Sequence, residues 1–368
     1  MAKLGEVCEV LDSKRVPITA ANRVSGQYPY YGANGVQDYV ADYIFDDELV
    51  LLAEDGGNFG SKEKPIAYRV SGKCWVNNHA HVLKPKAVID VDYLCYSLMF
   101  YDVSGLVNGA TRQKLTQSDM RKMEIPLRTM VEQKNIVCRL NKLTELISLR
   151  KQQLAKLDEL VKARFVEMFG DPVTNPKGYE KYKLENLARK ISDGVHSKPD
   201  YTETGRPFLS VVNINKGVIN FKNCKYVSED AYQKMIKSTH PERGDVLYTK
   251  VGATYGIPAY VDTDIAFCLY VSVCLIKPKR EVINPRFLSL SMEMPYVKHQ
   301  ADRRIKGIGV PDLHLNQISE FEILCPPLKE QDIFIYFVER LDGEKRVVQQ
   351  SLDKLELMKK ALMQDYFG

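Results

Sequence analysis

The sequence predicts an α+β fold built as a tandem duplication, in which two globular domains of mixed α/β structure are each followed by one long α-helix. Three observations predict this fold. The last 62 residues repeat an earlier segment without a gap. Both copies of the repeat carry a long stretch rich in helix-forming residues, and the regions before them are rich in short β-like runs and turns.

The internal repeat is the clearest of these observations. Residues 109–170 and 307–368 align at a constant offset of 198 positions with 15 identities in 62, far more than unrelated segments would share. Both copies end in Phe-Gly. Shorter matches precede the repeat: residues 3–4 with 183–184, 47–49 with 245–247, and 84–86 with 277–279. The chain is therefore interpreted as two units, each a variable globular part followed by a more similar terminal part.

The repeated ends are predicted to be helices. Residues 131–168 contain no Gly or Pro, and apolar residues recur there at a heptad-like spacing of three and four. A helix of this length would measure about 57 Å. Two such stripes would bury each other, either as a helical hairpin core or as a spacer between two heads, and their placement one whole unit apart favours the spacer. The stripes consist of Leu140, Leu143, Ile147, Leu154, Leu157 and Val161, and of Val338, Leu341, Val348, Leu352, Leu355 and Leu362.

Composition and charge bound the possible functions. The chain has 368 residues, of which 45% are hydrophobic and 27% are charged, an ordinary globular balance. Its longest apolar runs, such as residues 333–338, are far shorter than the roughly 20 residues that span a bilayer. A cytoplasmic protein without a membrane partner is therefore expected. The net charge of +5 permits a polyanionic partner without demanding one.

Cysteine and histidine indicate neither a disulfide framework nor a metal site. None of the eight cysteines has C-x-x-C spacing, so reduced thiols in a cytosolic core are expected. His79 and His81 would lie on one face of a strand. Two histidines alone do not make a metal site, and no metal is predicted.

A search for catalytic motifs also returns none. The stretch 56–62, Gly-Gly-Asn-Phe-Gly-Ser-Lys, has the wrong spacing for a phosphate-binding loop. The sequence has no G-x-S-x-G elbow, no H-E-x-x-H, and no cofactor loop or Asn/Asp-Pro-Pro-aromatic motif of an adenine methyltransferase. We therefore predict no catalytic residues.

Several loops instead have the chemistry that contacts DNA, because phosphate binding needs exposed cations and base reading needs paired donors and acceptors. Each loop taken alone is better explained by an ordinary solvated turn. The loops before the two helices, however, carry cations at corresponding points of both units. The candidate DNA-binding residues are Lys14, Arg15, Tyr31, Asn58, Lys62, Arg112, Lys114, His196, Lys198, Lys250, Tyr255, Arg303, Arg304 and Lys306.

The arrangement resembles the specificity subunit of a Type I restriction-modification system. Residues 313–331 read as an amphipathic stretch, a short strand, Pro-Pro-Leu and then Glu-Gln, which is similar to the family's entry into a conserved helix. The first copy keeps Glu-Ile-Pro at 124–126 and Glu-Gln at 132–133, with Arg-Thr at 128–129 in place of Pro-Pro. Residues 191–196 and 244–252 also resemble motifs of target-recognition domains.

This resemblance implies two target-recognition domains, at residues 1–130 and 171–330, each reading one half of a bipartite DNA target. It implies that the spacers at 131–170 and 331–368 pair as an antiparallel coiled coil in a pseudo-twofold tandem duplication and set the distance between half-sites. The chain would be non-catalytic. Its partners would be double-stranded DNA, two methyltransferase subunits that methylate adenine N6, and restriction/translocase subunits. Those partners would use S-adenosylmethionine, ATP and Mg²⁺, with no cofactor in this chain.

Three other readings remain open from the sequence. The first is an enzyme with an unfamiliar active site, which would show turnover by the purified chain alone. Of the remaining two, one is the specificity subunit of a related Type II-like or methylation-only system, which has the same chemistry with different partners. The other is a non-enzymatic coiled-coil scaffold whose heads bind protein, which would show no salt-dependent affinity for DNA.

Overall fold

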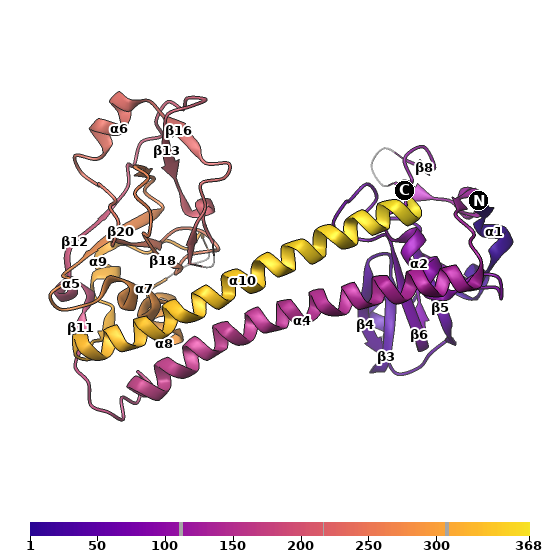
Figure 1. The fold of residues 1–368 in the computed structure, drawn as a ribbon, viewed down its shortest axis with the longest axis horizontal. Coiled ribbons are helices and arrows are strands. Elements are labelled where there is room, and N and C mark those ends of the chain that lie inside the picture. The colour runs from indigo at the N-terminus through magenta and orange to yellow at the C-terminus, as the bar shows by residue number, and fades with distance from the viewer. Residues whose placement is uncertain (110–112, 216, 306–308) are drawn as a thin grey trace. The chain divides into compact units, whose positions relative to one another are not determined.

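The computed structural model describes residues 1–109, 113–215, 217–305 and 309–368 (Figure 1). The chain divides into two compact units. The first unit comprises Met1–Gln152 together with Gln349–Gly368, and the second unit comprises Gln153–Val348. The first unit therefore contains both the beginning and the end of the chain.

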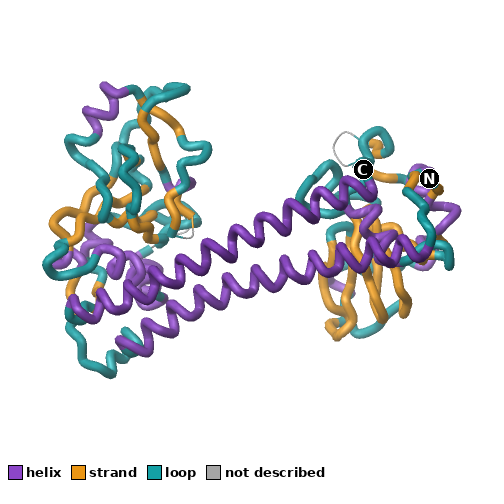
Figure 2. Tube along the Cα trace, in the orientation of Figure 1, coloured by secondary structure: helices purple, strands orange, loops and turns teal. Residues whose placement is uncertain are grey.

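A six-stranded sheet with the strand order β2-β7-β5-β6-β3-β4 forms the centre of the first unit. Neighbouring strands are antiparallel, apart from the parallel pair β3 and β6. Figure 1 labels several elements of the first unit, and Figure 2 colours helices and strands differently. The elements of the first unit before its long helices are β1 (Ala2–Lys3), α1 (Leu4–Val7), β2 (Cys8–Val10), η1 (Asp12–Lys14), η2 (Ala20–Asn22), β3 (Ser25–Gly32), β4 (Gly35–Val40), β5 (Phe45–Ala53), β6 (Ala67–Val76), β7 (Ala80–Pro85), α2 (Val91–Met99), β8 (Val107–Asn108), β9 (Lys114–Leu115), α3 (Gln117–Lys122) and β10 (Glu124–Ile125).

Strand β5 is buried on both faces, as its continuous apolar sequence requires. Val50 and Leu52 pack in one cluster with α2, while Leu49 and Leu51 pack in a second cluster on the other face. Helix α2 begins at Asp90, whose side chain accepts hydrogen bonds from the two backbone amides at the start of the helix. The sheet is thus covered by α2 on one side.

The second unit contains a four-stranded antiparallel sheet with the order β12-β20-β17-β18. A separate three-stranded sheet, β16-β13-β19, repeats the antiparallel and parallel pairings of β4-β3-β6 in the first unit, and a hairpin, β14-β15, lies beside it in the chain. Its elements are β11 (Lys181–Lys183), α5 (Leu184–Leu187), β12 (Ala188–Asp193), β13 (Arg206–Leu209), η3 (Val211–Asn213), β14 (Ile214–Asn215), β15 (Val218–Ile219), β16 (Lys225–Val227), α6 (Glu229–Met235), β17 (Val246–Thr249), β18 (Pro258–Tyr260), β19 (Cys268–Leu269), β20 (Val273–Pro278), α7 (Pro285–Glu293), α8 (Pro295–Arg304), α9 (Leu315–Ser319) and β21 (Glu322–Leu324).

The two units share a sheet of the same design, with β2-β7-β5-β6 corresponding to β12-β20-β17-β18. Pro85 lies opposite Cys8 in one sheet, and Pro278 lies opposite Ala188 in the other. The sequence match of residues 84–86 with 277–279 is thus a match of structurally equivalent positions. The duplication extends from the terminal helices into the globular parts.

The sequence match of residues 47–49 with 245–247 differs by two positions from the equivalence that strand pairing gives. Val50 pairs with Leu83, and Val246 pairs with Ile276 at the corresponding place. This makes Leu49 the counterpart of Asp245, whereas the match of residues 47–49 with 245–247 had paired Asp47 with it. Strand pairing decides the equivalence here, because a short match cannot fix register in a strand of similar apolar residues.

Two helices of 40 residues each, α4 (Met130–Phe169) and α10 (Leu328–Phe367), contribute to both units. In the first unit, Lys151 pairs with Glu356 and Arg139 donates a hydrogen bond to Tyr366. In the second unit, Lys345 pairs with Asp158, and the guanidinium of Arg164 lies over the ring of Phe337. In each unit, residue numbers rise along one helix as they fall along the other, so the paired halves run antiparallel.

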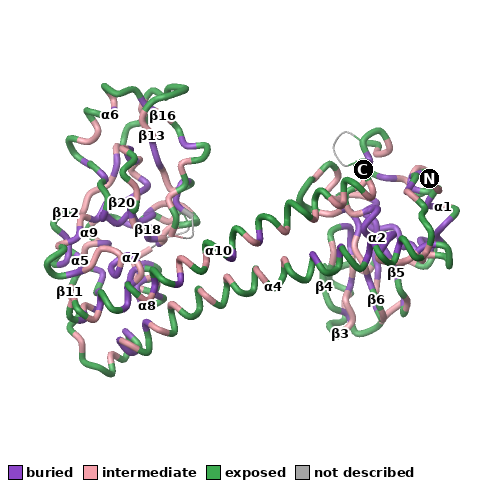
Figure 3. The backbone as a smooth tube through the Cα atoms, viewed as in Figure 1, coloured by how far each residue is buried: buried purple, intermediate pink, exposed green. Residues whose placement is uncertain are grey.

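None of the twelve apolar positions singled out on these helices is exposed. Figure 3 shows exposed and less exposed stretches alternating along both helices. The positions toward the start of each helix are the more deeply buried ones. Leu140, Leu143, Val338, Leu341, Val348 and Leu352 are buried. Ile147, Leu154, Leu157, Val161, Leu355 and Leu362 are half-buried.

Each long helix is fixed at its start by a fully buried glutamine. Gln133 accepts a hydrogen bond from the amide of Asp90 at 2.8 Å and donates to the carbonyl of Arg128 at 2.8 Å. Gln331 accepts from the amide of Asn284 at 2.8 Å and donates to the carbonyl of Pro326 at 2.7 Å. Since Asp90 and Asn284 also begin α2 and α7, the same glutamine joins the same two elements in each unit.

The eight cysteines are free thiols, of which Cys138 is exposed, Cys325 is half-buried and the other six are buried. Burial raises the pKa of Cys8 and Cys95 to about 12. Among the described residues, no helix combines the length and apolar character that crossing a membrane requires.

Candidate nucleic-acid interface

The candidate residues of the first unit differ in how accessible they are. Lys14, on η1, and Lys62 are exposed. Asn58 is half-buried. Tyr31 is half-buried in β3, with its ring stacked on Tyr68 at 5.8 Å between centroids. The two lysines are thus available to a phosphate, while Tyr31 contributes to packing.

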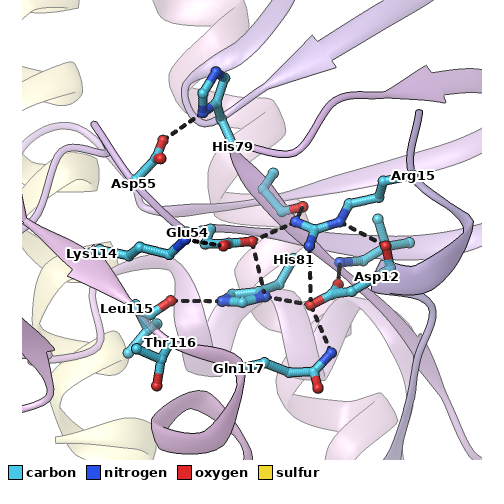
Figure 4. A network of polar contacts seen from close by, with 12 residues as sticks. Asp12, Arg15, Glu54, Asp55, His79, His81, Lys114, Leu115, Thr116 and Gln117 are labelled. Carbon is cyan, nitrogen blue, oxygen red and sulfur yellow. Dashed lines mark hydrogen bonds and ion pairs between the residues drawn. The ribbon is translucent and has the colours of Figure 1, made fainter. Parts of the chain in front are cut away.

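Arg15 and Lys114 meet at one carboxylate, that of Glu54, which directly follows β5 (Figure 4). Arg15 Nη1 lies 2.5 Å from Glu54 Oε2, and Lys114 Nζ lies 2.9 Å from Glu54 Oε1. The side chain of Arg15 is only 13% exposed, so its charge is used inside the protein. Burial would raise the pKa of Glu54, but the hydrogen bonds from Arg15 and Lys114 outweigh it and hold the pKa below its ordinary value.

His81 and Asp12 complete this cluster. His81 Nδ1 lies 2.6 Å from Asp12 Oδ2, and its Nε2 lies 2.9 Å from the carbonyl oxygen of Leu115. Asp12 also accepts from the amide of Val82 at 2.8 Å and from the side chain of Gln117 at 3.1 Å. Burial raises the pKa of Asp12, but the hydrogen bond and charge of His81 oppose it and the pKa stays below its ordinary value.

Asp12, Glu54 and His81 are residue types that bind metal ions, and their ligand atoms all lie within 4.8 Å of one another. Arg15 and Lys114 nevertheless occupy the oxygens of Glu54, so the carboxylate already has cationic partners. The expectation that His79 and His81 share a strand face is wrong. Strand β7 begins at Ala80, and His79 bonds Asp55 at 2.6 Å, away from the cluster (Figure 4).

Three of the candidate DNA-binding residues of the second unit have exposed side chains. Lys198 and Arg303 face solvent, and His196 lies 3.3 Å from Asp193 with most of its ring exposed. Arg304 is half-buried over the ring of Phe321. These exposed side chains are suited to contact an anionic partner.

Tyr255 is also half-buried, and its hydroxyl is engaged inside the unit. It donates to Asp302 Oδ1 at 2.6 Å. Lys298 Nζ sits 3.5 Å from the centre of its ring, within the range of a cation–π interaction. Two of the remaining candidates, Arg112 and Lys306, lie outside the described residues.

Lys250 is buried instead of exposed, with 6% of its side chain accessible. Its ammonium lies 3.6 Å from Asp193 Oδ2 and 3.6 Å from Asp312 Oδ1. Its backbone carbonyl accepts a hydrogen bond from Leu313 at 2.9 Å. This arrangement favours an internal role for Lys250.

Sequence reasoning missed a basic concavity of about 310 Å³ in the second unit. Arg243, Arg280 and Arg286 line it together with Tyr260. Arg243 pairs with the exposed Asp264, and Arg280 donates to the carbonyl of Arg243. The three arginines come from separate segments, so no local motif announces the concavity.

A strip of exposed apolar side chains on each long helix was also missed. Cys138 and Leu149 are exposed on α4, and Tyr336 and Val347 are exposed on α10. Eleven residues make just over three helical turns, so each pair lies on one helix face. The pairs are equivalent in the sequence repeat, and the same period continues at Leu160 and Met358, which are exposed too. We call the pair on α4 the first strip and the pair on α10 the second strip.

Comparisons with known proteins agree with the duplicated architecture. The sequence matches the family described as the Type I restriction modification DNA specificity domain over residues 1–159 and 176–357. A Haemophilus influenzae protein, inferred to be a type I restriction enzyme specificity subunit, is 26% identical over 98% of this chain and 94% of its own. The type I restriction enzyme MjaVIII specificity subunit of Methanocaldococcus jannaschii is 21% identical over 99% of this chain and 90% of its own.

Solved structures share the fold. The S subunit of a Type I restriction-modification system from M. genitalium has a TM-score of 0.62 at 15% identity, covering 100% of this chain and 95% of that chain. A chain from a study of complex assembly in a type I system has a TM-score of 0.56 at 16% identity, covering 100% and 96%.

Proposed function

Since the chain belongs to the family of Type I restriction modification DNA specificity domains and is a DNA-recognition subunit, we propose how it reads DNA. Each of its two globular heads reads one half of a bipartite DNA target. The duplicated sheet carries the proposal, because β2-β7-β5-β6 and β12-β20-β17-β18 would present two similar platforms. The recognition heads are assigned to residues 1–130 and 171–330. Related Type II-like systems would use the same two heads.

Exposed cations on both heads support DNA as the partner. Lys14 and Lys62 on the first head, and Lys198 and Arg303 on the second, are free to approach phosphates. His196 adds a donor that can reach a base edge. Affinity should therefore fall steeply as salt rises.

The long helices would set the distance between the half-sites. Each is about 60 Å long, and heads that read one face of B-DNA must stand about one helical turn, or 34 Å, apart. The antiparallel contacts found in each unit, such as Lys151 with Glu356 and Asp158 with Lys345, suit a two-stranded coiled coil over residues 131–170 and 331–368.

The two strips would receive two methyltransferase subunits. A partner present in two copies needs two similar surfaces, and Cys138 with Leu149 matches Tyr336 with Val347 at the repeat offset. A basic residue follows the first residue of each strip by about one helical turn: Lys142 on α4 and Arg340 on α10. An amphipathic helix with an apolar and acidic face would complement both strips.

The chain would contribute recognition and no chemistry. S-adenosylmethionine would bind to the methyltransferase subunits, which would flip and methylate the target adenine at N6. ATP and Mg²⁺ would bind to the restriction/translocase subunits. The specificity of the whole complex would then follow from the two heads of this chain.

Genome-wide mapping of adenine methylation tests this function. The chain is co-expressed with the methyltransferase subunit encoded beside it, in a host that lacks other adenine methylation. A split motif with a defined gap, and one methylated adenine per half on opposite strands, is the expected result. An assembled complex that methylates a single continuous motif would contradict the two-headed reader. A folded chain that shows no salt-dependent DNA affinity would favour a protein-binding scaffold instead.

A further inference from the structure

A buried ionic cluster occupies the same place in both units, although its members differ. The amide of Leu115 donates to the carbonyl of Glu54 at 2.7 Å, and the amide of Leu313 donates to the carbonyl of Lys250 at 2.9 Å. Leu115 and Leu313 are identical positions of the repeat. Glu54 directly follows β5, and Lys250 directly follows the corresponding strand β17. Glu54 and Lys250 are therefore structural counterparts.

The partners of these two residues are counterparts as well, with the charges exchanged. Glu54 pairs with Lys114 at 2.9 Å. Lys250 pairs with Asp312 at 3.6 Å. Lys114 and Asp312 each precede the equivalent leucine. An acid held by a base in the first unit is thus a base held by an acid in the second.

A third member, an aspartate, keeps its charge in both units. Asp193 lies opposite Cys274 in the second sheet, and Cys274 is the counterpart of His81. Asp12 bonds His81 at 2.6 Å, and Asp193 lies 3.6 Å from Lys250. We call each set of three charged residues an ionic clasp. In the first unit it comprises Asp12, Glu54 and Lys114, with Arg15 and His81 each contacting both acids. In the second unit it comprises Asp193, Lys250 and Asp312, and both acids contact the lysine directly.

Each clasp joins three separate segments that the sequence predicts to contact DNA. Each segment either contains one clasp residue or ends within three residues of one. The clasp thus holds distant parts of the chain at one point. The described parts of these segments are residues 13–15, 56–62, 108–109 and 113–114 in the first unit, and residues 192–198, 249–255, 303–305 and 309 in the second.

The clasps are well placed to hold these segments because their central charges are withdrawn from solvent. The side chain of Lys250 is 6% exposed, and that of Glu54 is 11% exposed. Removing one partner of a buried pair leaves the other charge without compensation, which is strongly unfavourable. Lys250 therefore cannot leave its two aspartates to meet a phosphate without that loss.

We propose, on the basis of the proposed DNA-reading function, that Glu54 and Lys250 are positioning residues, each the centre of an ionic clasp that holds three DNA-reading segments of its head together. The two heads use the same device, in which the central residue and the residue before the equivalent leucine have exchanged their charges. Neither central residue touches DNA; each acts through the segments that it holds.

The acids in the clasps make the proposal testable, because positioning and long-range charge predict opposite effects on DNA binding when an acid is removed. Removing an acid near DNA strengthens binding if only long-range charge matters. If the clasp positions the reading segments, Asp312→Asn instead lowers discrimination at the half-site read by the second head. Lys250→Met lowers it to a similar extent. The double variant is no worse than the singles, because both substitutions break one and the same unit.

The experiment uses the full chain assembled with its methyltransferase subunit. Binding is measured across a salt series on a duplex carrying the mapped methylation motif, and on duplexes with one or the other half-site altered. We expect Asp312→Asn and Lys250→Met to reduce discrimination at one half-site by about tenfold, the size of one lost base contact. Discrimination at the other half-site stays unchanged. Glu54→Gln should reduce discrimination at the half-site read by the first head and leave the half-site read by the second head unchanged.

Lys198→Met is the matched control, because Lys198 is an exposed lysine of the same head. It should weaken binding to all duplexes and lower the slope of log affinity against log salt by about one, without changing discrimination. If Lys250→Met behaves like this control, Lys250 contacts phosphate directly and the clasp is refuted.

Two further outcomes would overturn the clasp. Tighter binding of Asp312→Asn and Glu54→Gln to every duplex would mean that the acids act only through charge. Unchanged discrimination would mean that the clasps hold nothing needed for reading. Asp312 is 46% exposed and Asn is its isostere, so this variant remains interpretable if Lys250→Met fails to fold. A wild-type complex without any methylation motif would instead refute the proposed function itself.

Discussion

At the scale of single residues, the paired glutamines at the start of the long helices are the most informative. Gln331 has no exposed surface, and its amide satisfies a donor of one segment and an acceptor of another. Gln331→Leu preserves the volume but removes the partner of the part-buried amide of Asn284 and of the buried carbonyl of Pro326. Each such group costs about 1–3 kcal/mol. Urea unfolding should therefore show a clear loss of stability, and Gln133→Leu should show the same loss in the first unit.

Gln350→Leu is the control for this prediction, since Gln350 is an exposed glutamine of the same helix as Gln331. It should change the free energy of unfolding little. Equal stability of Gln331→Leu and Gln350→Leu would show that the buried amide contributes nothing beyond its volume.

Acid should weaken the first unit through the carboxylates of its clasp. The pKa of Asp12 and that of Glu54 lie below their ordinary values of 3.8 and 4.5. Groups with a lowered folded pKa stabilise fully above the ordinary value and lose that contribution as pH falls through the folded one. We expect stability to fall below about pH 4.5. Trp75, the single tryptophan, lies in the first unit and reports its unfolding by fluorescence.

Glu54→Gln should be less stable than the wild-type chain at pH 7 and should depend less steeply on pH below about 4.5. An acid transition of unchanged steepness in this variant would show that other carboxylates govern the acid unfolding.

The candidate cations illustrate what sequence can and cannot predict about single residues. Lys14, Lys62 and Lys198 were expected on exposed loops, and the structure exposes them. Arg15 and Lys250 have the same local sequence character but point inward. Their direction depends on acids that strand pairing brings from far along the chain, such as Asp193 beside Lys250. Local composition carries no information about that pairing.

At the scale of elements, the long helices follow directly from the sequence. Residues 131–168 were predicted as one helix because they lack Gly and Pro, and α4 spans Met130–Phe169. It ends where Gly170 adopts a positive φ of 78°, which favours glycine. The short strands could not be predicted equally well. Two-residue strands such as β9 exist only through their partners, so their own sequence does not specify them.

The strips on these helices give a prediction about assembly. Leu149 is 50% exposed and Val347 is 66% exposed, each in a different unit. A glutamate at either position would repel the acidic face expected of the partner helix. Leu149→Glu and Val347→Glu should each bind one methyltransferase subunit instead of two, and the double variant should bind none. Native mass spectrometry of the purified complexes measures this stoichiometry.

Val212→Glu is the control for the strips, because Val212 is 83% exposed and belongs to η3 and not to a long helix. It should bind two subunits. Cys138 offers an independent measurement, as the exposed thiol of the first strip. It should react with a thiol reagent in the free chain and be protected in the complex. Full stoichiometry in the double variant would place the docking surface elsewhere.

At the scale of the whole molecule, the division into units differs from the division into repeats. The repeat pairs residues 109–170 with 307–368 in the order of the chain. The first unit instead gathers Met1–Gln152 and Gln349–Gly368, so each unit contains the first half of one helix and the second half of the other. The repeat reveals the duplication, but it cannot reveal this exchange of halves. The exchange follows from the antiparallel pairing, which was expected from the family resemblance alone.

This exchange determines how the spacing between the half-sites should respond to added residues. Both helices cross from one unit to the other, so an insertion must enter both of them, after Gln152 in α4 and after Val348 in α10. Whole heptads keep the apolar seam aligned. Three heptads add about 32 Å at 1.5 Å per residue. At 3.4 Å per base pair this is about nine base pairs, close to one turn of B-DNA.

We therefore expect the three-heptad variant to methylate the same two half-sites with about nine more unread base pairs between them. One heptad adds only about 10 Å, or about a third of a DNA turn. The second head would then face the wrong side of the duplex, and bipartite methylation should be lost. Methylation mapping distinguishes the cases, and circular dichroism verifies that the inserted residues are helical. An unchanged gap in the three-heptad variant would mean that the helices join the heads without measuring the distance between them.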